Sequence, residues 1–267
     1  MAPETDPKKY LLVTGVARSG TTALGELLNS HSKICLGIER FKFQFLRDHT
    51  YERSLFERER FFDFRAEDTN LAPASRPAWK PVYDAMAEKW DSAELIGDKV
   101  PDMMPVLTDF MNANPDFKII CLLRNLKDVG LSWQARADRQ RDSWPSGKGF
   151  LAACESWAEQ IGTLHEMMRD KSLRRQVLLL DYDTMYNQPD HTEAALLAFL
   201  GLESEPWFRE LLRDHAEFFE NRRSRKVPRG FIETYKEVNQ GHIRGLRKVA
   251  KEQLETWAAR DETQGAN

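Results

Sequence analysis

Short apolar runs alternate with helical patterns along most of the chain. Five of these runs have the composition of buried strands: Tyr10–Thr14, Ile34–Leu36, Leu95–Ile96, Phe117–Leu123 and Val177–Leu180. Near-continuous runs of Val, Ile and Leu are typical of parallel strands that helices cover on both faces. The pattern therefore predicts a mainly parallel sheet inside the molecule.

Between these runs, apolar residues recur at the spacing of amphipathic helices. The stripes are Leu24, Leu27 and Leu28, then Val106, Leu107, Phe110 and Met111, and last Phe150, Leu151, Cys154, Trp157, Ile161, Leu164 and Met168. Alternating strands and helices predict an α/β fold with a central sheet flanked by helices. We expect one domain over residues 1–267, with an irregular, proline-containing insertion at about 61–92 and a frayed polar tail after about 257.

Composition narrows the classes of function. The formal net charge of −3 does not favour a basic nucleic-acid-binding domain, and 41% hydrophobic residues suffice for a core. No apolar run reaches the roughly 20 residues that span a bilayer, and the polar N-terminus does not resemble a secretory signal. Cys35, Cys121 and Cys154 are too scattered for a disulfide framework. We therefore expect a reducing, cytoplasmic setting, with Cys35 and Cys121 as packing residues.

The most informative stretch is a strand that runs into a glycine-bounded loop and then into a helix. Gly15 and Gly20 have the spacing of the nucleotide-binding P-loop, G-x-x-x-x-G-K-[ST]. In such a loop the backbone amides and the helix N-terminus point at an anion. Thr21 stands where a nucleoside triphosphatase has lysine, Thr22 keeps the hydroxyl, and the positive charge lies within the loop at Arg18.

The missing lysine changes the chemistry that this loop supports. In P-loop enzymes the lysine reaches the β- and γ-phosphates of a magnesium-bound triphosphate. Without it, triphosphate hydrolysis and kinase chemistry are disfavoured, and an arginine suits an anion with less charge to neutralise. Two alternatives stay open: a P-loop phosphotransferase that uses ATP and magnesium, and a non-catalytic nucleotide-binding protein.

The segment Arg18-Ser19-Gly20-Thr21-Thr22 resembles the sulfotransferase family, and most of all its branch of tyrosylprotein sulfotransferases and bacterial relatives. In that family an R-S-G-T-T loop holds the 5′-phosphosulfate of 3′-phosphoadenosine 5′-phosphosulfate (PAPS), whose product is 3′-phosphoadenosine 5′-phosphate (PAP). The resemblance implies a P-loop-type three-layer sandwich, PAPS as the donor and no metal. It implies these loop residues as donor-binding: Gly15, Arg18, Ser19, Gly20, Thr21 and Thr22.

Further motifs extend the resemblance over roughly residues 10–135. In the family, a strand-ending arginine and a serine eight residues later bind the 3′-phosphate, and Arg124 and Ser132 match them. Eight residues include about two helical turns, so both groups can converge on one phosphate. The tyrosylprotein branch has a glutamate base 21 residues after the loop arginine, where Glu39 stands, and a lysine before a proline-started helix, where Lys99 stands.

The resemblance implies transfer of a sulfuryl group to an acceptor hydroxyl, or to an amine. Glu39 would take the acceptor's proton as general base, while Arg18 and Lys99 would stabilise the developing negative charge. Plainer alternatives stay open: a surface ion pair between Glu39 and Arg40, and a solvated loop position for Lys99. Because the tyrosylprotein branch carries a membrane anchor and this chain has none, we expect a small-molecule or saccharide acceptor; the oligomeric state is not predicted.

Four other features have more than one interpretation. His31 suits a helix-capping role, whereas His49 is a candidate acceptor-lining or catalytic residue. Segment 222–229 holds five basic residues in eight, which suits a loop over the 3′-phosphate, steering of an anionic acceptor, or plain solvation. Asp181-Tyr182-Asp183 resembles a tyrosine–acid segment that many family members carry. These phenylalanines either pack in the core or line an acceptor pocket: Phe41, Phe43, Phe45, Phe56, Phe61, Phe62 and Phe64.

Overall fold

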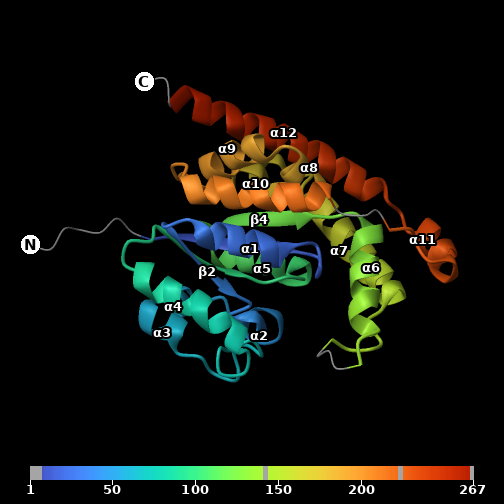
Figure 1. Ribbon diagram of the computed structural model, residues 1–267, viewed down its shortest axis with the longest axis horizontal. Coiled ribbons are helices and arrows are strands. Elements are labelled where there is room, and N and C mark those ends of the chain that lie inside the picture. Colours follow the sequence, from blue (N-terminus) through green and yellow to red (C-terminus); the bar gives the residue numbers. More distant parts are fainter. Residues whose placement is uncertain (1–7, 141–143, 222–224, 265–267) are drawn as a thin grey trace, which may run out of the picture.

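A computed structural model describes residues 8–140, 144–221 and 225–264 of the chain (Figure 1). Its sheet is all parallel, with the strand order β2-β3-β1-β4-β5. The strands are β1 (Lys9–Gly15), β2 (Ile34–Ile38), β3 (Leu95–Lys99), β4 (Lys118–Leu123) and β5 (Val177–Asp181). All five predicted strands are confirmed.

Helices connect and cover these strands. The α-helices are α1 (Thr21–Ser30), α2 (Lys42–Leu46), α3 (Arg58–Phe62), α4 (Lys80–Lys89), α5 (Leu107–Ala113), α6 (Leu126–Ala137), α7 (Phe150–Met167), α8 (Tyr182–Asn187), α9 (Pro189–Leu200), α10 (Pro206–Glu220), α11 (Ile232–Glu237) and α12 (Gly241–Gln264). Short 3-10 helices are η1 (Arg53–Phe56), η2 (Pro77–Trp79), η3 (Met104–Val106), η4 (Lys171–Arg175) and η5 (Arg229–Phe231).

The three-layer sandwich follows from the alternation of side chains along each strand. Leu11 and Val13 of β1 pack in one core cluster with residues of α1, α8, α9 and α10. Leu12 packs in the other cluster with residues of α4, α5 and α7. In Figure 1 α8, α9 and α10 lie above the sheet and α4 lies below it, so helices cover both faces and the predicted fold class is confirmed.

Both edges of the sheet are covered by side chains that pair with strand backbone. At the β2 edge the Asn29 amide bonds to the N–H and the C=O of Leu36, and the Ile38 amide donates to the Tyr83 hydroxyl at 3.0 Å. At the β5 edge the Gln253 amide accepts from the Leu179 N–H at 2.9 Å. These contacts satisfy groups that would otherwise offer an open template for another strand.

Two expectations about irregular structure differ from what is observed. The expected insertion at 61–92 contains α4, in which Pro81 occupies the first turn, where proline is tolerated, and Tyr83 and Met86 are buried. The tail expected to fray after about 257 continues as α12 to Gln264, because Leu254 and Ala258 pack against the α9 layer. No helix within the described ranges is both long and apolar enough to cross a lipid bilayer.

Candidate functional site

The glycine-bounded loop joins β1 to α1 at the centre of the sheet. The chain turns through Gly15, Arg18 and Gly20 with positive φ angles of 152°, 71° and 108°. A Cβ atom on Gly15 would lie 2.5 Å from the carbonyl oxygen of Leu122, and one on Gly20 would lie 2.4 Å from the Tyr182 ring. The loop therefore needs glycine at both positions. The loop follows β1, and later strands of the chain are added to the sheet on both sides of β1. Open α/β sheets bind ligands at such a switch point in strand order.

The loop backbone is held from two sides at Ala17. Its amide donates to Asp102 Oδ1 at 2.7 Å, and its carbonyl oxygen accepts from the Trp133 indole at 2.8 Å. Asp102 also receives a bond from the Gln160 amide at 2.9 Å, and its own N–H donates to the Gly15 carbonyl at 2.9 Å. These contacts fix the shape of the loop before any ligand binds.

The three predicted cationic and hydroxyl groups of the donor site meet beside this loop. Arg18 Nε donates to Ser132 Oγ at 3.2 Å, and Arg124 Nη1 donates to the Arg18 carbonyl at 3.1 Å. The Arg124 guanidinium lies 4.1 Å from the centre of the Tyr182 ring, and the Trp157 indole donates to the Arg124 carbonyl at 2.9 Å. The end of β4 and the helix α6 thus bring Arg124 and Ser132 to the loop, as their spacing predicts.

The loop carries the features of an anion cradle. Ser19 is 1% exposed, and among the described residues its hydroxyl has no hydrogen-bond partner. Helix α1 starts after Gly20 without a side-chain cap and without an acidic residue in its first turn, so its first amides keep their donor capacity. The buried Ser19 hydroxyl and the first amides of α1 are hydrogen-bond donors at the same loop. Such a set of donors fits the phosphate end of a nucleotide such as PAPS. Thr21 and Thr22, the first residues of α1, lie at this same helix start.

Glu39 and Lys99 form the second half of the site, at the ends of β2 and β3. Lys99 Nζ donates to Glu39 Oε1 at 3.2 Å and to Thr22 Oγ1 at 3.4 Å. Lys42 Nζ donates to Glu39 Oε2 at 2.8 Å. Burial raises the pKa of the Glu39 carboxyl, but the charges of Lys99 and Lys42 outweigh this effect and lower the pKa overall. Glu39 is therefore ionised at neutral pH.

The backbone around Glu39 is held by β3. Glu39 has a positive φ of 53°, and its N–H donates to the Lys99 carbonyl at 2.8 Å. The buried Asp98 carboxylate accepts the N–H groups of Arg40 and Phe41 at 2.9 and 2.8 Å. Burial raises the pKa of Asp98 to about 6, while the two amide bonds act in the opposite direction. Asp98 and Lys99, neighbours on one strand, thus fix the turn and the carboxylate of the predicted base.

The plainer alternatives for these residues do not match the geometry. Arg40 pairs with the buried Asp68 at 2.7 Å and not with Glu39. Lys99 is 1% exposed and so is not a solvated loop cation. The surface ion pair between Glu39 and Arg40 and the solvated position of Lys99, both left open by the sequence, are therefore wrong.

Other sequence candidates lie elsewhere. His49 is exposed, follows the end of α2, and contacts the Tyr51 hydroxyl at 3.2 Å. His31 is buried at the end of α1 and bonds to the Glu203 carbonyl at 2.9 Å, which confirms a structural role. Cys35, Cys121 and Cys154 are buried and free.

The phenylalanine cluster is mostly core. Four of its members are 5% exposed or less and their rings pack on one another, with Phe41 edge-to-face on Phe56 and on Phe61: Phe41, Phe45, Phe56 and Phe61. Phe43 is half-buried beside the exposed Arg47 guanidinium, at 5.1 Å. Packing of the core is therefore the main role of this segment.

The basic segment is only partly within the described residues, since 222–224 lie outside them. Arg225, Lys226 and Arg229 are exposed. Phe231, just beyond them, stacks on Phe150 of α7 at 4.9 Å. In Figure 1 α11, which follows this segment, lies at the end of the molecule toward which β4 points, and Arg124 directly follows β4.

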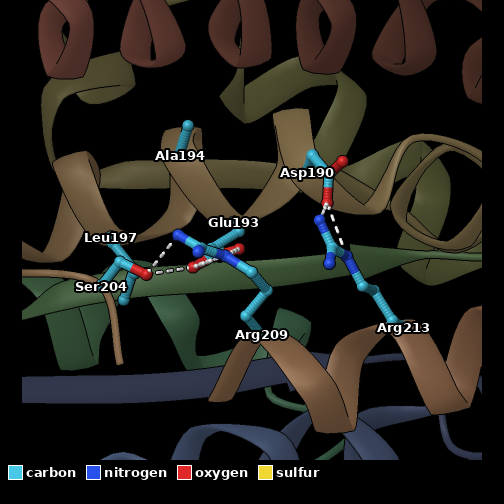
Figure 2. A pocket seen from close by; sticks show the side chains of 7 residues that line it. All are labelled: Asp190, Glu193, Ala194, Leu197, Ser204, Arg209 and Arg213. Atoms are coloured by element: carbon cyan, nitrogen blue, oxygen red, sulfur yellow. Dashed lines mark hydrogen bonds and ion pairs between the residues drawn. The ribbon is translucent and has the colours of Figure 1, made fainter. Parts of the chain in front are cut away.

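A separate cavity of about 190 Å³ lies between α9 and α10 (Figure 2). Its arginines are paired inside the cavity: Arg209 with Glu193 at 2.9 Å, and Arg213 with Asp190 at 2.9 Å. None of the residues lining it belongs to the loop, Arg124–Ser132 or Glu39–Lys99. We therefore place the candidate site at the strand ends, and not in this cavity.

Sequence reasoning missed Asp102, Trp133 and Trp157 as supports of the site. Their bonds join positions far apart in the chain, such as Asp102 with Ala17 and Trp157 with Arg124. The nearest available signal is position, because Trp133 follows Ser132 and Asp102 follows the Lys99-Val100-Pro101 segment directly.

Comparisons with known proteins bear on the family and the fold of the chain. A model of the sulfotransferase family matches residues 11–206. The fold is similar to that of the sulfotransferase domain from the Synechococcus PCC 7002 olefin synthase, with a TM-score of 0.50, 14% identity, and 94% of this chain and 98% of that chain covered. It is also similar to mouse sulfotransferase SULT7A1 complexed with PAP, with a TM-score of 0.50, 14% identity, and 93% and 85% covered.

A third similar structure is the sulfotransferase domain from the curacin biosynthetic pathway. Its TM-score is 0.50 at 15% identity, with 92% of this chain and 97% of that chain covered. At such low identities these likenesses show the fold alone. No curated protein matches the chain.

Proposed function

The chain belongs to the sulfotransferase family, and on that premise we propose that it transfers a sulfuryl group from PAPS to an acceptor hydroxyl with Glu39 as general base. The family decides between the alternatives that the sequence left open, in favour of sulfuryl transfer. One observation carries the proposal for this site. Lys99 donates hydrogen bonds both to Thr22, at the start of α1, and to Glu39. The anion cradle (the loop from Gly15 to Thr22) and the proposed proton acceptor therefore share one buried cation.

The donor-binding role is assigned to two groups of residues. The loop from Gly15 to Thr22, with the start of α1, would hold the phosphosulfate end through backbone amides and the Ser19 hydroxyl. Arg124 and Ser132 would hold the 3′-phosphate, for which the forked guanidinium donors are suited. The prepositioned contacts of Arg18 with Ser132 and Arg124 support this assignment.

PAPS, when bound, supplies a sulfuryl group: a bond forms from sulfur to the acceptor oxygen as the bond from sulfur to the 5′-phosphate oxygen breaks, with its electron pair leaving on PAP. Glu39 receives the acceptor's proton at its carboxylate. Lys99 cannot withdraw from the site because its stem is buried in β3, so its charge stays where negative charge develops. Arg18 adds a second cation at the loop. These fixed cations do the work for which a kinase uses magnesium, and we propose that no metal takes part.

For the acceptor we propose a small molecule or a saccharide bearing a hydroxyl group. A cytoplasmic setting agrees with the three free, buried cysteines.

The proposal is tested with sulfur-labelled PAPS and a panel of hydroxyl acceptors, in the presence of EDTA, together with calorimetric titration of PAP and of ATP. We expect label transfer that survives EDTA, and PAP binding much tighter than ATP binding. Glu39→Gln is expected to lower kcat by about 100-fold or more while leaving PAP affinity unchanged, since general bases contribute about 10²–10⁴-fold.

Lys80→Met is the matched control for the charged variants. Lys80 is an exposed lysine on α4 that pairs with Asp84 at 2.6 Å. It should leave turnover and PAP affinity unchanged. Transfer that requires magnesium, or tighter binding of ATP than of PAP, would contradict the proposed function.

A further inference from the structure

Both oxygens of the Glu39 carboxylate are occupied by lysines that differ in their surroundings. Lys99 bonds to Oε1 at 3.2 Å and its side chain is 1% exposed. Lys42 bonds to Oε2 at 2.8 Å and its side chain is 31% exposed. Lys42 is the first residue of α2, three residues after Glu39, and it is the more exposed of the two lysines.

The two contacts differ in how easily they break. A partly exposed lysine–glutamate pair three residues apart contributes little to stability, because solvent screens the charges. A buried lysine cannot leave its carboxylate without stranding a charge in the protein interior. When an acceptor reaches Glu39, Lys42 is therefore the partner that moves.

The position of Lys42 matters for proton transfer. With both lysines in place, Glu39 is a weak proton acceptor, because two ammonium groups favour its ionised form. The charged and titratable groups that interact with it are Lys99 from β3, Lys42 from α2 and Tyr83 from α4, and Asp98 precedes Lys99 on β3. The Asp98 carboxylate accepts hydrogen bonds from the backbone N–H groups of Arg40 and Phe41. In the part of the chain that the structure describes, Glu39 is the one carboxylate with which Lys42 forms an ion pair.

We propose that Lys42 selects acceptors that carry an anionic group beside the reacting hydroxyl: the anion pairs with Lys42, draws its ammonium away from Glu39, and leaves Oε2 to receive the proton. This inference rests on the proposed function for the role of Glu39. The group fitted by an ammonium on a flexible stem is a carboxylate, a sulfate or a phosphate. A neutral acceptor leaves the Lys42–Glu39 pair intact and meets a weaker base.

The proton balance of the step is simple. The hydroxyl proton of the acceptor moves to Glu39 Oε2, and the electron pair of that O–H bond stays on the oxygen that bonds to sulfur. The ammonium of Lys42 keeps its proton and exchanges one carboxylate partner, Glu39, for the anion of the acceptor. Binding of the anion and basicity of Glu39 are thereby coupled.

The test is a titration of the Glu39 carboxyl by carbon NMR on protein with labelled glutamate, in which Glu39→Gln identifies the resonance. We expect Lys42→Met to raise the pKa of Glu39 and Lys42→Arg to restore the wild-type value. Lys80→Met, which breaks an exposed pair with Asp84, should leave the Glu39 pKa unchanged. Acetate should raise the Glu39 pKa in the wild type and not in Lys42→Met, and acetamide should do so in neither.

Kinetics give the size of the effect. For 3-hydroxybenzoate against 3-hydroxybenzamide, which differ in one charge, Lys42→Met should lower the ratio of kcat/KM values by about tenfold, the equivalent of one charge-assisted contact of about 1.4 kcal/mol. An equal ratio in the wild type and Lys42→Met overturns the proposal.

The titration decides the proposal without a turnover measurement. An unchanged Glu39 pKa in Lys42→Met, or a wild-type pKa that does not respond to acetate, overturns the role of Lys42. That outcome together with tight PAP binding leaves the proposed function standing. Failure of PAP to bind contradicts the proposed function whatever the titration shows.

Discussion

Asp102 accepts the amide of Ala17 at 2.7 Å, and this bond ties the turn after β3 to the loop after β1. Asp102 has a positive φ of 62°, and its own amide returns a bond to the Gly15 carbonyl at 2.9 Å. Lys99 lies three residues before it on the same segment. The anion cradle and the cation beside Glu39 are therefore parts of one rigid frame.

A variant series at Asp102 separates its hydrogen bond from its backbone conformation. Asn keeps an acceptor oxygen and tolerates positive φ, so Asp102→Asn should retain PAP affinity within a few-fold. Asp102→Gly keeps the conformation and loses the acceptor, and it should weaken PAP binding by about 10- to 100-fold, since a hydrogen bond to a charged group is worth about 1.5–3 kcal/mol. Calorimetric titration measures both. Equal affinity in the Gly variant and the wild type would show that the bond does not shape the loop.

Gly20 provides a steric test of the cradle. A Cβ there would lie 2.4 Å from the Tyr182 ring, at a φ of 108°. We expect Gly20→Ala to lower the free energy of unfolding by about 1–3 kcal/mol, because the ring must move and the backbone is strained. PAP affinity should fall with it. Chemical denaturation measures the stability.

Gly147→Ala is the matched control, because a Cβ at Gly147 meets nothing within 4 Å. It should change neither stability nor PAP affinity. If Gly20→Ala behaves like this control, the close approach of Tyr182 to the loop is wrong.

The buried ion pair of Asp68 predicts an acid-dependent loss of stability. Burial raises the pKa of Asp68, but hydrogen bonds from Arg60 and Arg40 prevail and bring it to about 2, below its ordinary value of 3.8. Because the pKa is lower in the folded state, the contribution is fully present above pH 4 and is lost as the pH falls toward 2. Asp68→Asn should cost about 3–5 kcal/mol at neutral pH, since it strands the Arg40 charge.

The measurement is denaturation of the wild type and Asp68→Asn as a function of pH. The difference between them should shrink as the pH falls from 4 toward 2. A difference that stays constant over this range would speak against a pair that stabilises the ionised carboxylate.

Asp98 predicts a pH dependence of the opposite sign. Its pKa is raised to about 6, chiefly by burial, so the folded protein holds this proton more tightly than the unfolded chain. Its contribution to stability therefore falls as the pH rises from about 4 to about 6. Above that range the carboxylate accepts the two amides that follow Glu39.

Turnover should therefore decrease as the pH falls through about 6 and Asp98 takes up a proton. Asp98→Asn replaces one acceptor oxygen by a donor, so it should lower kcat at neutral pH by about tenfold, the cost of one unmade buried hydrogen bond, and leave PAP affinity unchanged. A pH profile of kcat and a PAP titration test this. A loss of PAP affinity equal to the loss of kcat would point to general unfolding instead of a displaced Glu39.

The strands and the loop could be predicted because their signals are local. Tyr10–Thr14 and Val177–Leu180 are continuous apolar runs, and the glycine spacing of the loop fixes a strand, a turn and a helix start in sequence. The run Leu95–Ile96 gave too short a strand, because Gly97 and Asp98 break the apolar pattern although both pair with β1. Asp98 is tolerated there since two amides satisfy its carboxylate.

The supports of the site could not be predicted, because they are contacts between distant segments. The bond of the Trp133 indole to Ala17 spans 116 positions, and that of the Ala17 amide to Asp102 spans 85. Nothing in the local sequence pattern shows that the Asp98 carboxylate accepts the N–H groups of the two residues that follow Glu39. Likewise, the sequence did not predict α4, because Pro77 and Pro81 are as common at the start of a helix as in a loop.

The central claim is that the cradle after β1 and the Arg124–Ser132 pair bind one nucleotide. The measurement that tests it most directly is a crystal structure of the protein with PAP. The account predicts the 5′-phosphate on the backbone amides between Gly15 and Thr22, and the 3′-phosphate within hydrogen-bond distance of Arg124 and Ser132. PAP bound elsewhere, as between Arg209 and Arg213 in the cavity of Figure 2, would contradict it.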